Sequence, residues 1–358
     1  MKCITGRYGC WLMAASCWLL AVGCSSDDTR EQRTTGILQV STYTKAYQDH
    51  EVLNRARSVS AGYTEYNPDH DIALGLFVVP DNTELDDQGR EAKLVRFSSG
   101  VWHSQVQVVG NENYRIFGYM PRRFPITATI DPGTSNVVLT LDQAEAVMTD
   151  DICFVTGVKD GTKDAEGDLL QGRFDYEGKS ENNNICLLLD HLYAAINFKF
   201  TVDAEYSALR SFKLTSMTLS TPKASVKAVI TLTPNTADTD PVTSVTYTTT
   251  KDSEGTNTAP FFNNADGVPI TDASISNYFC CFVPQEIVSN ALTLVCTYDV
   301  YDNTGTYKIR ENCTAENLLP HLNVARGERM TLNMKVTPTY LYQLAEPDLD
   351  NPTILIGD

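Results

Sequence analysis

The stretch "GILQVSTYT", Gly36–Thr44, shows the pattern that decides the fold. It is short, rich in β-branched and aromatic side chains, and bounded by polar segments, as β-strands are. Similar runs recur along the chain between Gly, Pro, Asn and Asp residues. In chain order they are "DIALGLFVV" (71–79), "KLVRFS" (93–98), "VWHSQVQVV" (101–109), "YRIFGYM" (114–120), "ITATI" (126–130), "NVVLTL" (136–141), "AAINFKFTV" (194–202), "SFKLTSMTLS" (211–220), "KAVITLT" (227–233), "SVTYTTT" (244–250), "YFCCFVP" (278–284), "LTLVCTYDV" (292–300), "TYKIRE" (306–311) and "MTLNMKVTPTYLY" (330–342). Many short strands at this spacing predict an all-β protein made of antiparallel β-sandwiches.

A long polar segment divides these runs into two series. "KDGTKDAEGDLLQGRFDYEGKSENNN", Lys159–Asn184, is rich in glycine and charge, and a chain of 358 residues fits two domains by its length. The sequence therefore predicts an N-terminal sandwich over residues 56–182 and a C-terminal sandwich over residues 183–345.

A few short helices are expected among the strands. Two segments fit helices, "LDQAEAVMTDD" (141–151) and "LLLDHLYAA" (187–195). A third, "TAENLLPHL" (314–322), fits a short helical turn.

The first 23 residues have the features of an export signal. Lys2 and Arg7 precede an apolar run, Cys10–Val22, which has the length of a signal peptide. This run is shorter than the roughly 20 residues that span a bilayer. Residues 1–23 are therefore predicted to be removed, which leaves 335 residues. Loss of the two cations moves the formal net charge from −17 to −19.

The apolar run ends at a cysteine. Ala21-Val22-Gly23-Cys24 resembles a bacterial lipobox, in which the cysteine thiol takes a diacylglycerol. A lipid on Cys24 would anchor the chain to a membrane without spanning it. Ser25–Asp28 resembles the acidic signal that directs such lipoproteins to the outer surface. The alternative is an ordinary signal peptide with an incidental cysteine.

The acidic charge limits the partners of the chain. A net charge of −17 argues against nucleic acid and against binding to anionic lipid by charge. Acidic residues are spread along the sequence, so they indicate solubility and self-repulsion.

The cysteines after the signal argue against a metal site. No CxxC pair is present and histidine is sparse, so neither a zinc site nor a cofactor is predicted. Cys280 and Cys281 are neighbours on a predicted strand and should point to opposite faces, so at most one should face the core. Buried thiols are expected, with Cys280 or Cys281 and Cys296 as the pair most able to form a disulfide. The six cysteines are Cys153, Cys186, Cys280, Cys281, Cys296 and Cys313.

The sequence contains no recognisable catalytic motif. It lacks G-x-S-x-G, H-E-x-x-H, a phosphate-binding loop and a dinucleotide fingerprint, so no catalytic residue is predicted. His191 lies among apolar residues and is expected to be a core histidine bonded to backbone. Trp102 could stack on a sugar, but packing in a sandwich core is the commoner role. Four acidic residues share one loop and are expected to be solvated, although they could hold calcium; they are Asp160, Asp164, Glu166 and Asp168.

Both ends of the mature chain carry strand-like segments. Gly36–Thr44 is followed by a polar stretch that contains Arg55 and Arg57. At the other end, a long strand leads through the acidic turn "AEPDLDNP" to "TILIGD", Thr353–Asp358. A continuous apolar run in this place should be buried, against its own domain or against another molecule.

At these residues the chain resembles the fimbrillin family of Bacteroidota, the Mfa-like lipoprotein subunits of type V pili. The resemblance covers most of the chain. It is carried, in order, by the lipobox, "NRA" (54–56), "GVWHS" (100–104), "YRIFGYMP" (114–121), "LLLDHLYAAINFKF" (187–200) and "VTPTYLYQLAEPDLDNPTILI" (336–356). The family implies two transthyretin-like β-sandwich domains and a cell-surface precursor that an arginine-specific protease cuts.

Carried onto this sequence, the resemblance assigns roles to both ends. Arg55 is the expected cleavage site and Arg57 the alternative, because Arg33 lies too early to release the first strand. Residues 24–55 then form a lipidated segment with a removable strand, and residues 346–358 form the tail of a donor strand. Such a strand fills the groove of the next subunit, head to tail. The donor residues are Thr353, Ile354, Leu355 and Ile356.

Other readings of the sequence stay open. A shaft, tip or base subunit fits the same pattern, and adhesion is compatible with all three. A monomeric outer-membrane lipoprotein that binds glycans would share the anchor and the sandwiches, but it should present several exposed aromatic side chains on one face. An enzyme is disfavoured because no nucleophile, base or metal cluster can be named.

Overall fold

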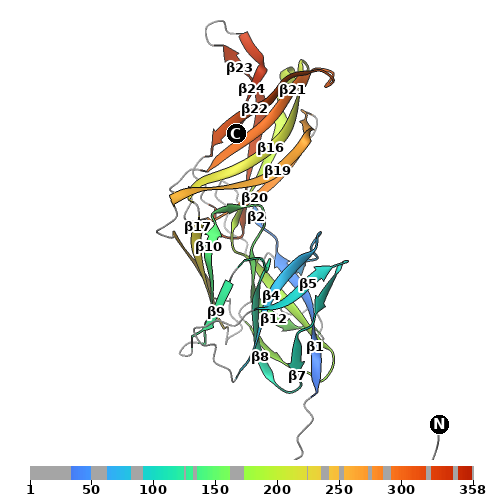
Figure 1. Ribbon diagram of the computed structural model, residues 1–358, viewed down its shortest axis with the longest axis vertical. Helices are drawn as coiled ribbons and strands as arrows, with labels where there is room; N and C mark the ends of the chain where they lie inside the picture. The colour runs from blue at the N-terminus through green and yellow to red at the C-terminus, as the bar shows by residue number, and fades with distance from the viewer. Residues whose placement is uncertain are drawn as a thin grey trace, which may run out of the picture. The chain divides into compact units, whose positions relative to one another are not determined.

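The computed structural model describes residues 34–49, 63–81, 92–124, 126–131, 135–161, 173–223, 225–234, 242–249, 254–272, 276–284, 292–319, 324–341 and 346–356. Cys24, Arg55 and Arg57 lie outside the described residues. The described part belongs to one unit, Thr34–Asp358, and is nearly all β-strand, as predicted (Figure 1).

The largest sheet has ten strands and contains the first strand of the described chain. Its order is β3-β1-β14-β12-β8-β4-β5-β6, with β13 paired to β8 and β7 paired to β1. The strands are β1 (Thr35–Lys45), β3 (Tyr63–Glu65), β4 (Ile72–Pro80), β5 (Lys93–Ser98), β6 (Val101–Ser104), β7 (Gln107–Val109), β8 (Asn113–Met120), β12 (Cys153–Asp160), β13 (Asp175–Glu177) and β14 (Asn183–His191).

A second sheet has four strands in the order β18-β17-β10-β9. It joins strands from distant parts of the sequence, because β10 pairs with both β9 and β17. The strands are β9 (Ile126–Ile130), β10 (Val137–Glu145), β17 (Ser225–Thr233) and β18 (Val242–Thr249).

Two further sheets contain most of the later strands. One has the order β11-β20-β15-β23-β2, with β24 also on β23, and the other has the order β19-β16-β21-β22. The strands of the first are β2 (Gln48–Asp49), β11 (Val147–Met148), β15 (Ala194–Val202), β20 (Ser276–Phe282), β23 (Glu328–Leu341) and β24 (Glu346–Ile356). Those of the second are β16 (Arg210–Lys223), β19 (Glu254–Ile270), β21 (Thr293–Asp302) and β22 (Lys308–Leu318).

Burial follows the period of the strands. In β17 every second residue is buried, which is the pattern of a strand with one face on the core. Strand β14 is buried almost without interruption, because side chains cover both faces of the ten-stranded sheet there. Leu38, Ile185 and Leu187 belong to one hydrophobic cluster, which lies largely within that sheet.

The pairing of β14 bears on the predicted division at residues 182 and 183. β14 lies between β1 and β12, so residues 183–191 share a sheet with the early strands. The division into two domains stays a prediction. In the structure, the pairing of β14 with β1 on one side and with β12 on the other joins residues from before and after this division.

The predicted helices were wrong. Residues 141–151 include the end of β10 and all of β11, residues 187–195 include most of β14 and the start of β15, and residues 314–322 include the end of β22. Pairing with distant strands overrides the local helix preference of these segments. The one helix among the described residues is α1 (Ala204–Ser207), capped by the Asp203 carboxylate, which accepts from the Glu205 amide. It is too short to cross a membrane, and no other described helix exists to do so.

The expectation for Cys280 and Cys281 was also wrong. Both side chains are fully buried, because β20 lies between β11 and β15 with core side chains on either face. All six cysteines after the signal are free, and only Cys313 is partly exposed.

A buried and an exposed aromatic side chain test this core. Phe200 on β15 is fully buried and meets Tyr278 edge to face, whereas Tyr307 is 70% exposed. We expect Phe200→Ala to lower the free energy of unfolding by about 3–5 kcal/mol, and Tyr307→Ala to change it by less than about 0.5 kcal/mol. Urea denaturation measures both, and equal effects would contradict the assigned core.

Candidate functional site

Strand β1 has partner strands on both of its sides. On one side Leu38–Thr44 pairs parallel with Asn183–Leu189 of β14. On the other side Thr35–Ile37 pairs with β7, and Tyr43–Lys45 pairs with β3, both antiparallel. Removing β1 would therefore leave unpaired backbone groups on three strands.

Side chains of β1 reinforce this backbone pairing. Leu38 and Thr42 are buried, and Val40 packs against the same hydrophobic cluster. The Thr42 hydroxyl donates to the Tyr66 carbonyl at 2.6 Å and accepts from the Trp102 indole at 3.1 Å. β1 thus places alternate side chains in pockets of the sheet, as an inserted strand must.

The segment after β1 is tied to a second sheet. The Gln48 amide donates to the Gly327 carbonyl at 3.0 Å, and Arg329 donates two hydrogen bonds to the Asp49 carboxylate. Tyr47 stacks on His191 with ring centroids 3.8 Å apart. Residues 35–49 therefore pair with strands of two different sheets. They lie shortly before Arg55 in the sequence.

The last strand, β24, lies on β23 of its own chain. Thr353–Ile356 pairs antiparallel with Met334–Thr337. Pro352 and Ile354 are buried, whereas Leu355 is half exposed. The four residues predicted to donate a strand are thus paired within the chain, with alternating burial.

Polar contacts also hold β24 in place. Tyr298 donates to the Pro352 carbonyl at 2.8 Å, and Tyr206 donates to the Leu349 carbonyl at 3.1 Å. The Arg210 guanidinium binds the Asp350 carboxylate at 2.7–2.8 Å. These contacts join the tail to α1, β16 and β21.

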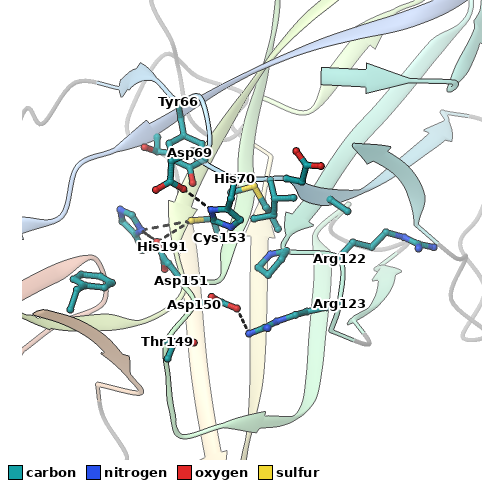
Figure 2. Close-up of a pocket in the computed structure, with 17 residues that line it drawn as sticks. Tyr66, Asp69, His70, Arg122, Arg123, Thr149, Asp150, Asp151, Cys153 and His191 are labelled. Atoms are coloured by element: carbon teal, nitrogen blue, oxygen red, sulfur yellow. Dashed lines mark hydrogen bonds and ion pairs between the residues drawn. The ribbon is translucent and has the colours of Figure 1, made fainter. Parts of the chain in front are cut away.

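A cluster of three polar side chains lies where β1 ends. His191 Nδ1 is 2.6 Å from the Asp151 carboxylate, and His191 Nε2 donates to the Lys45 carbonyl at 2.6 Å. The Cys153 sulfur lies 3.4 Å from Asp151 and 3.7 Å from His191 Nδ1 (Figure 2). Among the described residues this is the one group of three side chains that could hold a metal ion.

The protonation of His191 follows from these contacts. Burial lowers the pKa of His191, but the attraction and hydrogen bond of Asp151 and the hydrogen bond to Lys45 outweigh it, so the pKa is raised above 6.5. Burial raises the pKa of the Cys153 thiol well above its usual value, and the Asp151 charge adds to this effect. Without a metal the cluster therefore holds a proton on both His191 and Cys153 near pH 6.5.

The structure places the other candidate residues as follows. His191 bonds to backbone, as predicted, and also to a carboxylate that the sequence did not indicate. Trp102 packs against Phe97 and the hydrophobic cluster, in agreement with the core role. Asp160 binds the Lys179 ammonium at 2.6 Å. Asp164, Glu166 and Asp168 lie outside the described residues.

The role of Asp151 was missed from the sequence. It was counted within a predicted helix, and it lies 40 residues from His191 along the chain. The pairing of β12 with β14, Cys153 opposite His191, brings the two together. An alternating Asp-x-Cys at a strand start was the only local signal.

Comparison with known proteins gives structural similarity only. No protein-family model and no curated protein matches this sequence. Among solved structures, the chain is similar to a putative cell adhesion protein from Bacteroides fragilis, with 11% identity, 90% of this chain and 98% of that chain covered, and a TM-score of 0.44. A fimbrial protein from Bacteroides vulgatus gives 14% identity, coverage of 90% and 98%, and a TM-score of 0.40.

A third similar structure is the fimbrial anchor protein Mfa2 from Porphyromonas gingivalis. It gives 10% identity, covers 88% of this chain and 95% of that chain, and has a TM-score of 0.23. Two of these three proteins are named as fimbrial.

Neighbouring residues on β1 provide a matched test of the strand. We expect Leu38→Ala to lower the free energy of unfolding by about 2–5 kcal/mol, because Leu38 is fully buried. Ile37→Ala should change it by less than about 0.5 kcal/mol, because that side chain is 55% exposed. Urea denaturation measures both variants, and a larger effect at Ile37 would contradict the orientation of β1.

His191 should make stability depend on pH. Its folded pKa is raised, so its contribution is complete below pH 6.5 and is lost as the pH rises through the folded value. The difference in unfolding free energy between wild type and His191→Gln should therefore shrink between pH 6 and pH 9, measured with a chelator present. His103→Gln is the control, because His103 is exposed. A difference that is constant with pH would contradict the buried ion pair.

Proposed function

We propose that this protein is a structural subunit of a type V fimbria. In this proposal it is exported as a lipoprotein with lipid on Cys24, cut at Arg55 or Arg57, and polymerised by donor-strand exchange at the cell surface. The observation that carries the proposal is the position of β1, a strand with partners on both sides that directly precedes the stretch with both arginines.

Loss of β1 would create a slot for another strand. The facing edges of β14, β7 and β3 would lose their backbone partners, and the pockets of Leu38 and Thr42 would open. Unpaired strand edges beside apolar pockets favour the addition of a new strand. An uncut subunit fills this slot with its own β1, so the precursor would not polymerise.

Strand β24 has the properties of a donor. Pro352 and Ile354 are buried at alternate positions, and Ile356 packs against the core, so one face of the strand is apolar. Inserted between β14 and β7, these side chains could replace Leu38, Val40 and Thr42. Transfer of β24 would break its contacts with Tyr298 and Arg210, and filling the open slot would offset this loss.

Donation from one copy to the next is a head-to-tail contact. Such a contact builds an open filament when its rotation does not close a ring. The partners in this proposal are other fimbrial subunits, the arginine-specific protease and, for the precursor, the outer membrane through the lipid on Cys24.

The pairing of β24 with its own β23 supports a second candidate. A subunit at the tip of a fimbria could keep its tail on its own chain, because it has no neighbour to receive it. The two candidates differ in one respect, whether β24 leaves β23 after cleavage.

Cleavage is the first test of the proposal. We expect an arginine-specific protease to convert the purified precursor into a chain that begins at Ala56 or Ser58 and forms polymers, as followed by mass spectrometry and size-exclusion chromatography. Arg55→Ala combined with Arg57→Ala should abolish cleavage and polymer formation, whereas Arg33→Ala should leave cleavage and polymer formation unchanged. Polymers from a chain that retains residues 34–55 would contradict the role of β1.

Deletion of the tail tests the donor. Removal of Asn351–Asp358 should leave a folded protein, checked by circular dichroism, that is cut normally but does not extend a filament. Normal polymers from this deletion would refute the donor role, and normal incorporation at filament ends alone would favour the tip.

A peptide provides a second test of the donor, with binding rather than polymerisation as the measurement. The peptide Glu346–Ile356 should bind cut protein that lacks its tail, and the same peptide with Ile354→Asp should not, because a charge would enter an apolar pocket. Equal binding of both peptides, or of either to uncut protein, would contradict insertion into the slot of β1.

A further inference from the structure

We propose that Asp151, Cys153 and His191 form a binding site for a divalent transition metal, with Zn²⁺ as the best fit. The three side chains supply one oxygen, one sulfur and one nitrogen atom, all within 4.8 Å of one another. Mixed ligands of this kind suit zinc and exclude the hard cations Ca²⁺ and Mg²⁺, which prefer oxygen ligands alone.

Two of the three distances between the ligand atoms agree closely with tetrahedral coordination. Zinc bonds of about 2.3 Å to sulfur and about 2.1 Å to nitrogen and oxygen place the sulfur about 3.6 Å from each of the other ligands. The observed distances are 3.7 Å from Cys153 to His191 and 3.4 Å from Cys153 to Asp151. The third distance, from His191 Nδ1 to the Asp151 carboxylate, is 2.6 Å because the two groups form a hydrogen bond. Around a metal ion this distance would increase to about 3.4 Å.

The surroundings of His191 prepare it as a ligand. Metal-binding histidines usually donate the N–H of the other ring nitrogen to a carbonyl or carboxylate, which fixes the tautomer. His191 Nε2 makes this bond to the Lys45 carbonyl, so Nδ1 is the atom directed at Cys153 and Asp151. Stacking of Tyr47 on the imidazole ring holds its orientation.

Asp151 has an oxygen that the described residues leave without a partner. Its Oδ2 bonds His191, whereas its Oδ1 is buried and accepts no hydrogen bond from the part of the chain that the structure describes. A buried carboxylate oxygen without a donor is costly. A cation held by both carboxylate oxygens would satisfy it, whereas the ligand separations given above are those of Oδ2.

A cavity gives an ion access to the cluster. It has a volume of about 760 Å³ and is lined by all three ligand residues together with Tyr66 and Phe279 (Figure 2). Water in this cavity could fill the fourth position of a tetrahedral ion. The neighbouring carboxylate Asp190 is 3.0 Å from the Arg326 guanidinium, so the ligand set would consist of one carboxylate, one thiolate and one neutral imidazole.

Metal binding would release protons. The ion replaces the proton on Cys153 Sγ and the proton on His191 Nδ1, because both atoms must offer a lone pair. Affinity should therefore increase with pH, because protons compete with the ion for these two atoms. The charge of the ion balances one carboxylate and one thiolate.

The absence of a CxxC pair concealed this site in the sequence. Asp151 and Cys153 precede His191 by 40 and 38 residues, and the antiparallel pairing of β12 with β14 brings them together. Asp151 lies two residues before Cys153, the first residue of β12.

Titration with Co²⁺ and Zn²⁺ tests the proposal. The protein is the full chain with Cys3→Ser, Cys10→Ser, Cys17→Ser and Cys24→Ser, so that these thiols do not bind metal. We expect one equivalent of Co²⁺ to give a sulfur-to-cobalt charge-transfer band that Zn²⁺ abolishes, with proton release in weak buffer. No such band in this protein would overturn the proposal, whatever the variants below do.

Two ligand variants and one matched control locate the site. Cys153→Ser should abolish the charge-transfer band, and Asp151→Asn should weaken Zn²⁺ binding at least by the roughly 10–100-fold that follows loss of an outer-shell partner. Cys186→Ser is the control, because Cys186 is also buried and lies on the same strand as His191, five residues before it. A band that persists in Cys153→Ser, or is lost in Cys186→Ser with the fold intact, would place the metal elsewhere.

Discussion

The backbone hydrogen bonds between β1 and β14 connect the features of this protein on which the proposals rest. They join residues that are about 145 positions apart in the chain, Leu38 with Asn183 through Thr44 with Leu189. β7 and β3 pair with the two ends of β1 on its other side, so the first described strand lies between other strands of the sheet. Buried backbone groups require partners, so any event that removes β1 also creates a demand for a replacement strand.

The end of β1 is where the sheet, the cluster and the following segment meet. The Lys45 carbonyl is the last one of β1 and accepts the hydrogen bond of His191. The same histidine contacts Tyr47 in the next segment and Asp151 before β12. The cluster therefore contacts the end of the strand that the proposed cleavage would release.

Local pattern predicted much of the secondary structure and failed at identifiable places. The bounds of β5, β9 and β15 were predicted to the residue, because their β-branched and aromatic side chains are bounded by clear breaks. β14 was assigned in part to a helix, because its run of leucines carries no alternation when both faces are buried. β19 was not predicted, since its Gly, Asn and Pro residues indicate a loop. Its pairing with β16 decides its conformation.

The sequence by itself determined the all-β class, the positions of most strands and the apolar character of both ends. These follow from side-chain properties that act within a few residues. Only the tertiary structure decided that β1 lies parallel to β14, that β10 pairs with β17, and that Asp151, Cys153 and His191 meet. Such contacts depend on register between distant strands, which no short stretch of sequence encodes. The tail illustrates both kinds of determination. Its apolar alternation can be found in the sequence alone, whereas its pairing with β23 is a property of the fold.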